Sequence, residues 1–240
     1  RTLRYTPDGE DFVIVNGDRK FTRALYGGHS GFRLETSDVP EFAFYLPHMG
    51  GNLSFSLQHG EHCLSLNEAS RVESRYRAGS RIYHITDPLM GKGKFTITAL
   101  ACYDEDAAIW QITAEDMPAD MELQWLYGGA SGSRFSREGD MGVDPADCFH
   151  LKPTYCKGND YTLQGEGFKV VFGQKSRYGE KTLYATAHPD SKLRISQLGT
   201  ERPESTKDTD CPVMKGSLRL SAGDNTYYLF IGRDRQPRYE

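Results

Sequence analysis

The side chains best suited to binding chemistry lie at the end of one strand pattern and in the long glycine-punctuated stretch 128–160 that follows it. Carbohydrate sites combine flat aromatic faces, which cover the apolar side of a pyranose, with planar polar groups for its hydroxyls. Six side chains here fit that mixture and are our candidate ligand-binding residues: Trp125, Tyr127, Arg134, Arg137, His150 and Tyr155. The strand aromatics that precede the loop could instead pack in the core, and the loop aromatics could instead anchor the loop to the rest of the fold.

The sequence singles out no catalytic residue. Gly28-His29-Ser30-Gly31 lacks the spacing and the strand-turn-helix context of a serine nucleophile elbow. Glycoside hydrolysis needs two carboxylates, yet no motif distinguishes two of the 33 acidic residues. The seven histidines likewise form no pattern that a mutarotase-type acid and base would need. Gly91-Lys92-Gly93-Lys94 lacks phosphate-loop spacing, so we expect a hairpin turn there.

We expect no metal and no cofactor. His59 and His62 would face opposite sides of a strand, and no fourth ligand accompanies them and Cys63, so 59–63 is predicted to be an exposed polar turn. The acidic groups at Asp104–Asp106 and at Asp140, Asp144 and Asp147 do not follow a regular calcium-loop pattern.

The five cysteines form no disulfide framework and no C-x-x-C motif. Cys102 lies in an apolar strand pattern, which predicts a small buried side chain. Cys148 and Cys156 flank the same part of the loop, and a bridge between them stays open.

The elements that would position these residues follow a period of two. Met121, Leu123, Trp125 and Tyr127 share one strand face, and residues 225–231 are apolar on both faces. We expect roughly fifteen strands, at 11–16, 19–25, 31–35, 41–46, 52–58, 70–77, 80–86, 94–103, 107–115, 121–127, 161–164, 167–173, 181–187, 192–198, 213–221 and 225–231. Asn16-Gly17 between apolar runs predicts a hairpin.

These patterns predict an all-β fold with little helix, a large two-sheet antiparallel β-sandwich, because many short strands bury one face each when two sheets stack. We expect a single domain over 1–231 and an exposed flexible loop at 199–212. The loop at 128–160 exceeds the usual length of a connection, and such loops are usually functional or disordered. Its aromatic residues favour an ordered loop that covers something.

Composition narrows the choice of partners. The 240 residues carry a formal net charge of −4, so a nucleic-acid partner is not expected, since such proteins usually have a basic excess. No apolar run approaches the length of about 18 residues that a membrane span requires. The chain starts at Arg1 without a leader pattern, and residues 232–240 are predicted to begin a linker. We therefore expect a periplasmic or secreted protein whose leader has been removed and whose downstream domain is a partner.

Several segments together resemble a known kind of domain. They are Trp125–Gly132, Phe135–Asp140, Asp144-Pro145, Leu151–Cys156 and the closing Leu218–Leu229. The chain is similar to an uncharacterised N-terminal β-sandwich domain family of large secreted proteins from polysaccharide-degrading gut bacteria. More broadly, it resembles the galactose-mutarotase-like supersandwich that precedes an (α/α)6 barrel in many glycoside hydrolases and phosphorylases.

The resemblance implies that the catalytic carboxylates belong to a helical barrel and that residues 128–155 form a rim loop. The function it implies is a non-catalytic accessory domain of a carbohydrate-active enzyme, packed on a downstream helical domain and contributing a loop to the glycan site. The alternatives are a stand-alone carbohydrate-binding module, a self-sufficient lyase or epimerase, and a structural domain without a ligand.

Overall fold

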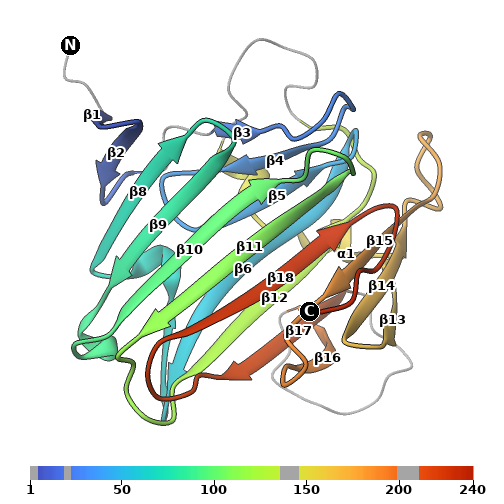
Figure 1. The fold of residues 1–240 in the computed structure, drawn as a ribbon. Coiled ribbons are helices and arrows are strands. Elements are labelled where there is room, and N and C mark those ends of the chain that lie inside the picture. The colour runs from blue at the N-terminus through green and yellow to red at the C-terminus, as the bar shows by residue number, and fades with distance from the viewer. Residues whose placement is uncertain (1–4, 19–22, 136–145, 199–210, 240) are drawn as a thin grey trace.

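The protein is a sandwich of two antiparallel β-sheets packed face to face (Figure 1). The structure is a computed structural model, and it describes residues 5–18, 23–135, 146–198 and 211–239. The expected all-β, two-sheet class is confirmed. The predicted flexible loop at 199–212 lies outside the described residues except for its last two positions.

The first sheet has ten strands and places the last strand of the chain near its middle. Its order is β1 (Thr6–Asp8), β2 (Asp11–Val15), β8 (Arg71–Arg77), β9 (Ser80–Thr86), β10 (Lys94–Ala101), β11 (Ala107–Glu115), β18 (Asn225–Gly232), β15 (Lys181–Thr186), β14 (Gly167–Phe172) and β13 (Asp160–Gln164). Between β11 and β15, the C-terminal half of β18 is buried on both faces, as its apolar pattern predicts, whereas Tyr228 in its first half stays exposed.

The second sheet has eight strands and carries the long loop. Its order is β16 (Lys192–Gln197), β17 (Pro212–Arg219), β12 (Glu122–Ala130), β6 (Met49–His59), β5 (Glu41–Tyr45), β4 (Arg33–Thr36) and β3 (Arg23–Leu25), with β7 (His62–Ser65) paired to β6. The described helices are short: η1 (Leu66–Glu68), η2 (Pro88–Met90), η3 (Ala146–Phe149) and α1 (Pro153–Cys156). None of them is long and apolar enough to cross a membrane.

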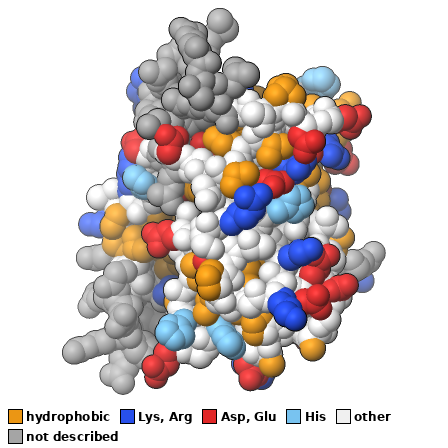
Figure 2. Space-filling view, turned by 90° about the vertical axis from the view of Figure 1, so that its left-hand side faces the viewer, with side chains coloured by type: hydrophobic (Ala, Val, Ile, Leu, Met, Phe, Trp, Pro, Cys, Tyr) orange, Lys and Arg blue, Asp and Glu red, His pale blue; other side chains and the backbone are white. Residues whose placement is uncertain are grey.

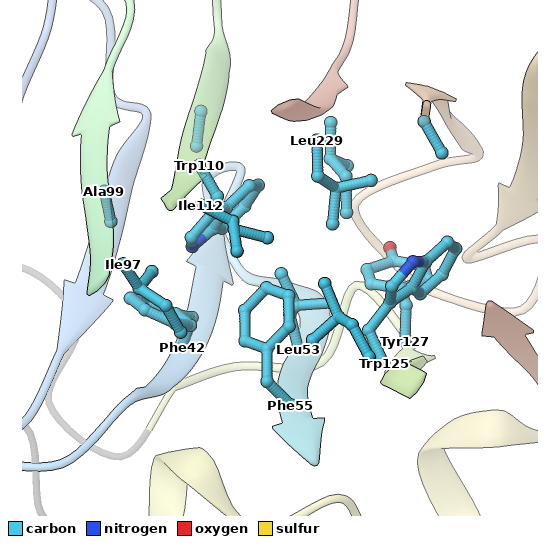
Figure 3. Packing of buried hydrophobic residues seen from close by; sticks show 14 of the residues in the cluster. Phe42, Leu53, Phe55, Ile97, Ala99, Trp110, Ile112, Trp125, Tyr127 and Leu229 are labelled. Atoms are coloured by element: carbon cyan, nitrogen blue, oxygen red, sulfur yellow. The ribbon is translucent and has the colours of Figure 1, made fainter. Parts of the chain in front are cut away.

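The main core fills the space between the sheets, where the inward side chains of both interdigitate (Figure 3). Trp110 of β11 has no exposed surface, and its ring lies 5.5 Å from that of Phe42 and 5.6 Å from that of Phe44, both on β5 of the opposite sheet. Such tilted and edge-to-face pairs add to the free energy gained by burying large apolar surface. The alternation of apolar and polar residues therefore predicts correctly which face of each central strand points into the core.

A buried polar link also joins the sheets. Arg81 of β9 donates a hydrogen bond to the carbonyl oxygen of Ser37, at 2.7 Å, and the hydroxyl of Tyr83 donates to the same oxygen, at 2.9 Å. Asp38 lies next to this Arg81 guanidinium, which is fully buried. Burial raises the pKa of Tyr83 far above its usual value, so its hydroxyl stays a donor.

The outer edge of the ten-stranded sheet carries charges of both signs (Figure 2). Arg75 contacts Asp8 at 2.8 Å, Glu73 at 2.7 Å and Asp11 at 3.2 Å, and Arg77 contacts Asp11 at 2.7 Å. Hydrogen bonds from Arg77 first, and then from Arg75, lower the pKa of Asp11. A charged edge with a three-residue first strand opposes pairing with another sheet.

The hairpin predicted at Asn16-Gly17 is wrong. β2 pairs with β1 and β8 in the ten-stranded sheet, whereas β3 pairs with β4 in the other sheet. Asn16 does adopt a positive φ of 50°, but its side chain extends the β2–β8 pairing by accepting from the amide of Val72 at 2.8 Å. Asn16 therefore has the backbone conformation of a turn, but the next strand, β3, belongs to the other sheet.

The turns predicted at 91–94 and at 59–63 agree with the structure. Gly91-Lys92 turns the chain between the antiparallel strands β9 and β10, as expected. His59 and His62 flank the tight turn of the β6–β7 hairpin, so the polar turn is confirmed. The strands β1 and β7 were not expected, because their residues are mostly polar and exposed.

Residues 233–239 lie against the ten-stranded sheet. The side-chain amide of Gln236 donates to the carbonyl oxygens of Gln164, at 3.0 Å, and Ala185, at 3.1 Å. The hydroxyl of Thr186 donates to the carbonyl oxygen of Pro237 at 2.6 Å. That this segment leads into a linker stays a prediction.

Packing in the core predicts a sharp cost for a methyl group at Gly216. A Cβ atom there would lie 2.0 Å from Cε2 of Trp125, on the neighbouring strand. We expect Gly216→Ala to lower the free energy of unfolding by about 1–3 kcal/mol in urea denaturation, the usual cost of overpacking. The control is Ser217→Ala, whose side chain faces outward; equal stability of the two variants would contradict this packing.

Candidate functional site

The described parts of the long loop, residues 131–135 and 146–159, lie over the outer face of the eight-stranded sheet. Beneath them lies a second apolar cluster, separate from the main core, which we call the anchor cluster. Its buried members are Ala43, Tyr45, Met49, Phe135, Cys148 and Phe149, with Tyr155 packed against them. Because β5 sends Phe42 and Phe44 into the main core and Ala43 and Tyr45 into the anchor cluster, the strand is buried on both faces.

A cation completes the anchor cluster. The guanidinium of Arg33 lies 3.7 Å from the ring centroid of Tyr45 and 5.7 Å from that of Phe135. It also forms an ion pair with Glu35. Cation–π contacts that are shielded from water are worth more than exposed ones, so this stack helps to hold the start of the loop on the sheet.

Two buried asparagines tie the loop to the strands through backbone groups. Asn52 of β6 donates to the carbonyl oxygen of Cys148 at 2.8 Å. Asn159 accepts from the amide of Ala130 at 3.2 Å and donates to the carbonyl oxygens of Ala130 and, at 3.1 Å, Tyr155. These bonds satisfy backbone groups that are otherwise buried without water, so they fix both ends of the segment.

A groove of about 900 Å³ opens beside the anchored loop. Three chain segments line it, and we call it the loop groove. They are Ser131–Arg134, then Thr154 with Lys157–Asp160, and the β14–β15 turn Gly173–Tyr178. The site is therefore assembled from residues distant in sequence, at the end of the sandwich where β12, α1 and β14 meet.

The wall formed by the β14–β15 turn is held in place. The hydroxyl of Ser176 donates to the carbonyl oxygen of Gly132 at 2.9 Å and accepts from the amide of Tyr178 at 3.2 Å. The ring of Tyr178 stacks on His48, with 3.3 Å between centroids, and the Arg177 guanidinium lies 4.6 Å from the same ring. Two walls of the loop groove are thus joined directly.

The lining of the loop groove is polar and mainly cationic. Its charged side chains are Arg134, Lys157, Lys175, Arg177 and Asp160. Hydroxyl and amide groups lie between them, so the groove offers both hydrogen-bond donors and acceptors. Among the described lining residues, Asp160 is the only carboxylate.

A second groove, of about 580 Å³, lies on the outer face of the eight-stranded sheet, and we call it the sheet groove. Its outward-facing polar residues are Ser54, Ser56, Ser65, Glu122, Gln124, Lys192, Arg194, Lys215 and Ser217. The strands β6, β12, β16 and β17 form its floor, so it is a shallow trough in a regular sheet rather than a site built by the loop.

Comparison with known sequences identifies the family of the chain. Residues 46–239 match the model of DUF4450, which is described as a domain of unknown function. The chain belongs to the DUF4450 family. Its matched region contains both grooves, the whole loop and every candidate ligand-binding residue. No curated protein sequence matches this DUF4450 chain.

Among the solved structures similar to this chain is one described as that of a candidate kojibiose phosphorylase from the human microbiome. It is 12% identical and superimposes with a TM-score of 0.47. The match covers 95% of the DUF4450 chain and 33% of the other, so this chain spans about one third of that protein.

The structure places two of the six predicted ligand-binding residues in the core. Tyr127 has no exposed surface, and its hydroxyl donates to the carbonyl oxygen of Gly50 at 2.7 Å. The ring of Trp125 stacks on Phe168 of the ten-stranded sheet, and only 5% of the residue is exposed, at the floor of the sheet groove. Core packing, the alternative for these strand aromatics, is what the structure shows, and neither ring faces the loop groove.

The three described candidate residues in the loop have three different positions. Arg134 lines the loop groove and is exposed there. Tyr155 is half-buried against the anchor cluster, with the Lys152 ammonium 5.4 Å from its ring. His150 is exposed but does not line either groove. Arg137 lies outside the described residues, as do Asp140 and Asp144.

Sequence reasoning missed most of the loop groove. The missed residues are Lys157, Lys175, Arg177 and Tyr178. The last three lie in the polar turn that runs from Gly173 to Gly179. Such a turn resembles any strand connection, so no local signal in the sequence marks it as part of a site.

The described residues show no metal cluster and no disulfide at the loop. No group of three or more His, Cys, Asp or Glu among them could hold a metal ion. Cys156 carries a free thiol, so it makes no bridge to Cys148. Burial raises the pKa of the Cys156 thiol to about 11, which makes it a poor nucleophile at neutral pH.

The ties of Asn159 lead to a direct test of how the loop is held. We expect Asn159→Ala to lower the free energy of unfolding by about 1–3 kcal/mol, because buried backbone groups of Ala130 and Tyr155 lose their partners. Urea denaturation measures this change. The matched control is Gln174→Ala at the exposed rim of the same groove. An Asn159→Ala protein as stable as that control would contradict the proposed anchoring.

Proposed function

We propose that this chain is a non-catalytic accessory β-sandwich domain of a carbohydrate-active enzyme, and that it contacts glycan in the loop groove. The observation that carries the proposal is the groove itself. It has the size of a ligand site, it is built by the long loop, and hydroxyl, amide and guanidinium groups line it.

A polyhydroxylated ligand matches this lining. Each sugar hydroxyl both donates and accepts, and the groove presents Ser131, Ser133 and Thr154 beside the side-chain amide of Gln174. The anchor cluster and the Ser176 bonds hold two of the walls before any ligand arrives. Preorganised walls reduce the entropy lost on binding, which favours recognition of a flexible chain of sugars.

Binding suits the groove better than hydrolysis does. A glycosidase places two carboxyl groups across the scissile bond, one as acid and one as base or nucleophile. Within the described part of the chain, Asp160 alone supplies a carboxylate to the loop groove. We therefore assign the chemistry of the parent protein, a glycoside hydrolase in this proposal, to a downstream helical domain of the same polypeptide in the periplasm or outside the cell.

Calorimetric titration of the folded chain with a panel of plant and host oligosaccharides tests the binding claim. We expect saturable binding to at least one glycan, with about tenfold or greater loss of affinity in Arg134→Ala/Gln174→Ala, since each change removes hydrogen bonds to the ligand. Tyr103→Ala is the control, because this exposed tyrosine lies outside both grooves. Flat titrations across the panel, or equal loss in the control, would refute the assignment.

Deletion from the full-length protein tests the accessory role. We expect a stable protein without this segment to lose activity on its glycan, because the domain supplies contacts to the substrate. Undiminished activity would remove the accessory role. Retained glycan affinity of the separate chain would then favour a stand-alone carbohydrate-binding module, which the groove supports because its described walls all come from this chain.

A further inference from the structure

We infer that the loop groove selects acidic oligosaccharides, in which a carboxylate or sulfate on the sugar contacts Arg177. This inference rests on the proposed function and names the ligand class of the same site. The shared chemistry is a planar or tetrahedral oxyanion attached to a sugar ring. An arginine fork binds such groups through two parallel hydrogen bonds.

The charge of the groove provides the first argument. Four cationic side chains line it against one carboxylate, although the whole chain has a formal net charge of −4. Among the described residues, no carboxylate lies in an ion pair with Lys157, Lys175 or Arg177. An anionic ligand in the groove would therefore be attracted by these positive charges.

The placement of Arg177 provides the second argument. Its guanidinium lies against the ring of Tyr178 and donates to the hydroxyl of the same residue. Tyr178 is itself fixed by stacking on His48 and by the hydrogen bond that its backbone amide donates to the Ser176 hydroxyl. A guanidinium held in this way loses little conformational entropy when it binds an anion, and its other N–H groups stay available to do so.

Lys157 and Lys175 provide the third argument, because they approach the groove from different segments. Lys157 follows α1, whereas Lys175 lies two residues before Arg177 in the β14–β15 turn. A neutral glycan gains little from several ammonium groups, whereas charges repeated along an acidic glycan can each meet a cation. The arrangement therefore favours a ligand with more than one acidic sugar.

The experiment compares trigalacturonic acid with its fully methyl-esterified form, which has the same sugar chain but neutral methyl esters in place of its carboxylates. By calorimetry at low salt, we expect the acid to bind at least about tenfold more tightly, as for one charge-assisted hydrogen bond. Salt screens such attraction, so the difference should shrink between about 50 and 500 mM NaCl. A sulfated carrageenan tetrasaccharide and its desulfated form make the second arm and distinguish sulfate from carboxylate.

Substitutions in the two grooves test which side chains cause the preference for the acid. Arg177→Gln should abolish the preference for the acid, and Arg177→Lys should restore only part of it, because an ammonium lacks the planar fork. Lys175→Gln is the second groove variant and should reduce the preference even if Arg177→Gln folds poorly. Arg194→Gln in the sheet groove is the matched control and should bind as the unaltered chain does.

The outcomes separate the two proposals. Equal binding of acid and ester would overturn the acidic preference and leave glycan binding intact, whereas no binding of any glycan would overturn both. A preference that is lost in Arg194→Gln instead of Arg177→Gln would place the anion in the wrong groove and refute the inference. Displacement of trigalacturonic acid by inorganic sulfate at equal concentration would do so too, since the site would then recognise any anion.

Discussion

The site depends on the burial of β5 on both of its faces. Phe42 and Phe44 pack between the sheets, and Ala43 and Tyr45 would leave apolar surface on the outer side of the eight-stranded sheet unless something covered them. Hydrophobic burial drives the loop to supply that cover through Phe135 and Phe149. The loop groove lies beside this covered area, where Ser131–Arg134 and Lys157–Asp160 face the β14–β15 turn.

The same constraint relates stability to recognition. The anchor cluster and the Asn52 and Asn159 ties fix the loop from below, while Ser176 joins it to the β14–β15 turn from the side. Among the described lining residues, the ammonium groups of Lys157 and Lys175 carry none of these structural contacts, and the Arg177 guanidinium donates to Tyr178. The fold thus holds the walls rigid and leaves cations exposed at the rim, which suits recognition of a charged, hydroxyl-rich ligand.

Sequence patterns predict the strands well because side-chain alternation reports directly on burial. Met121, just before β12, and Leu123, Trp125 and Tyr127 within it all lie in the core, as their alternation predicts. Trp125 and Tyr127 were also candidates for ligand binding, because the residue types alone suit both roles. Pairing between strands is not encoded locally in the same way. Asn16-Gly17 turns the chain as its residues suggest, yet β2 and β3 belong to different sheets. Most of the loop groove escaped prediction for a similar reason, because the β14–β15 turn meets Gly132, through Ser176, only in the folded sandwich.

Amide chemical shifts recorded while an acidic oligosaccharide is titrated into the protein show directly whether the loop groove binds it. We expect the shift changes to concentrate at 131–134, 157–160 and 173–178, with the side-chain signal of Arg177 among the most strongly affected. Changes confined instead to β12, β16 and β17 would place the ligand in the sheet groove and refute recognition in the loop groove.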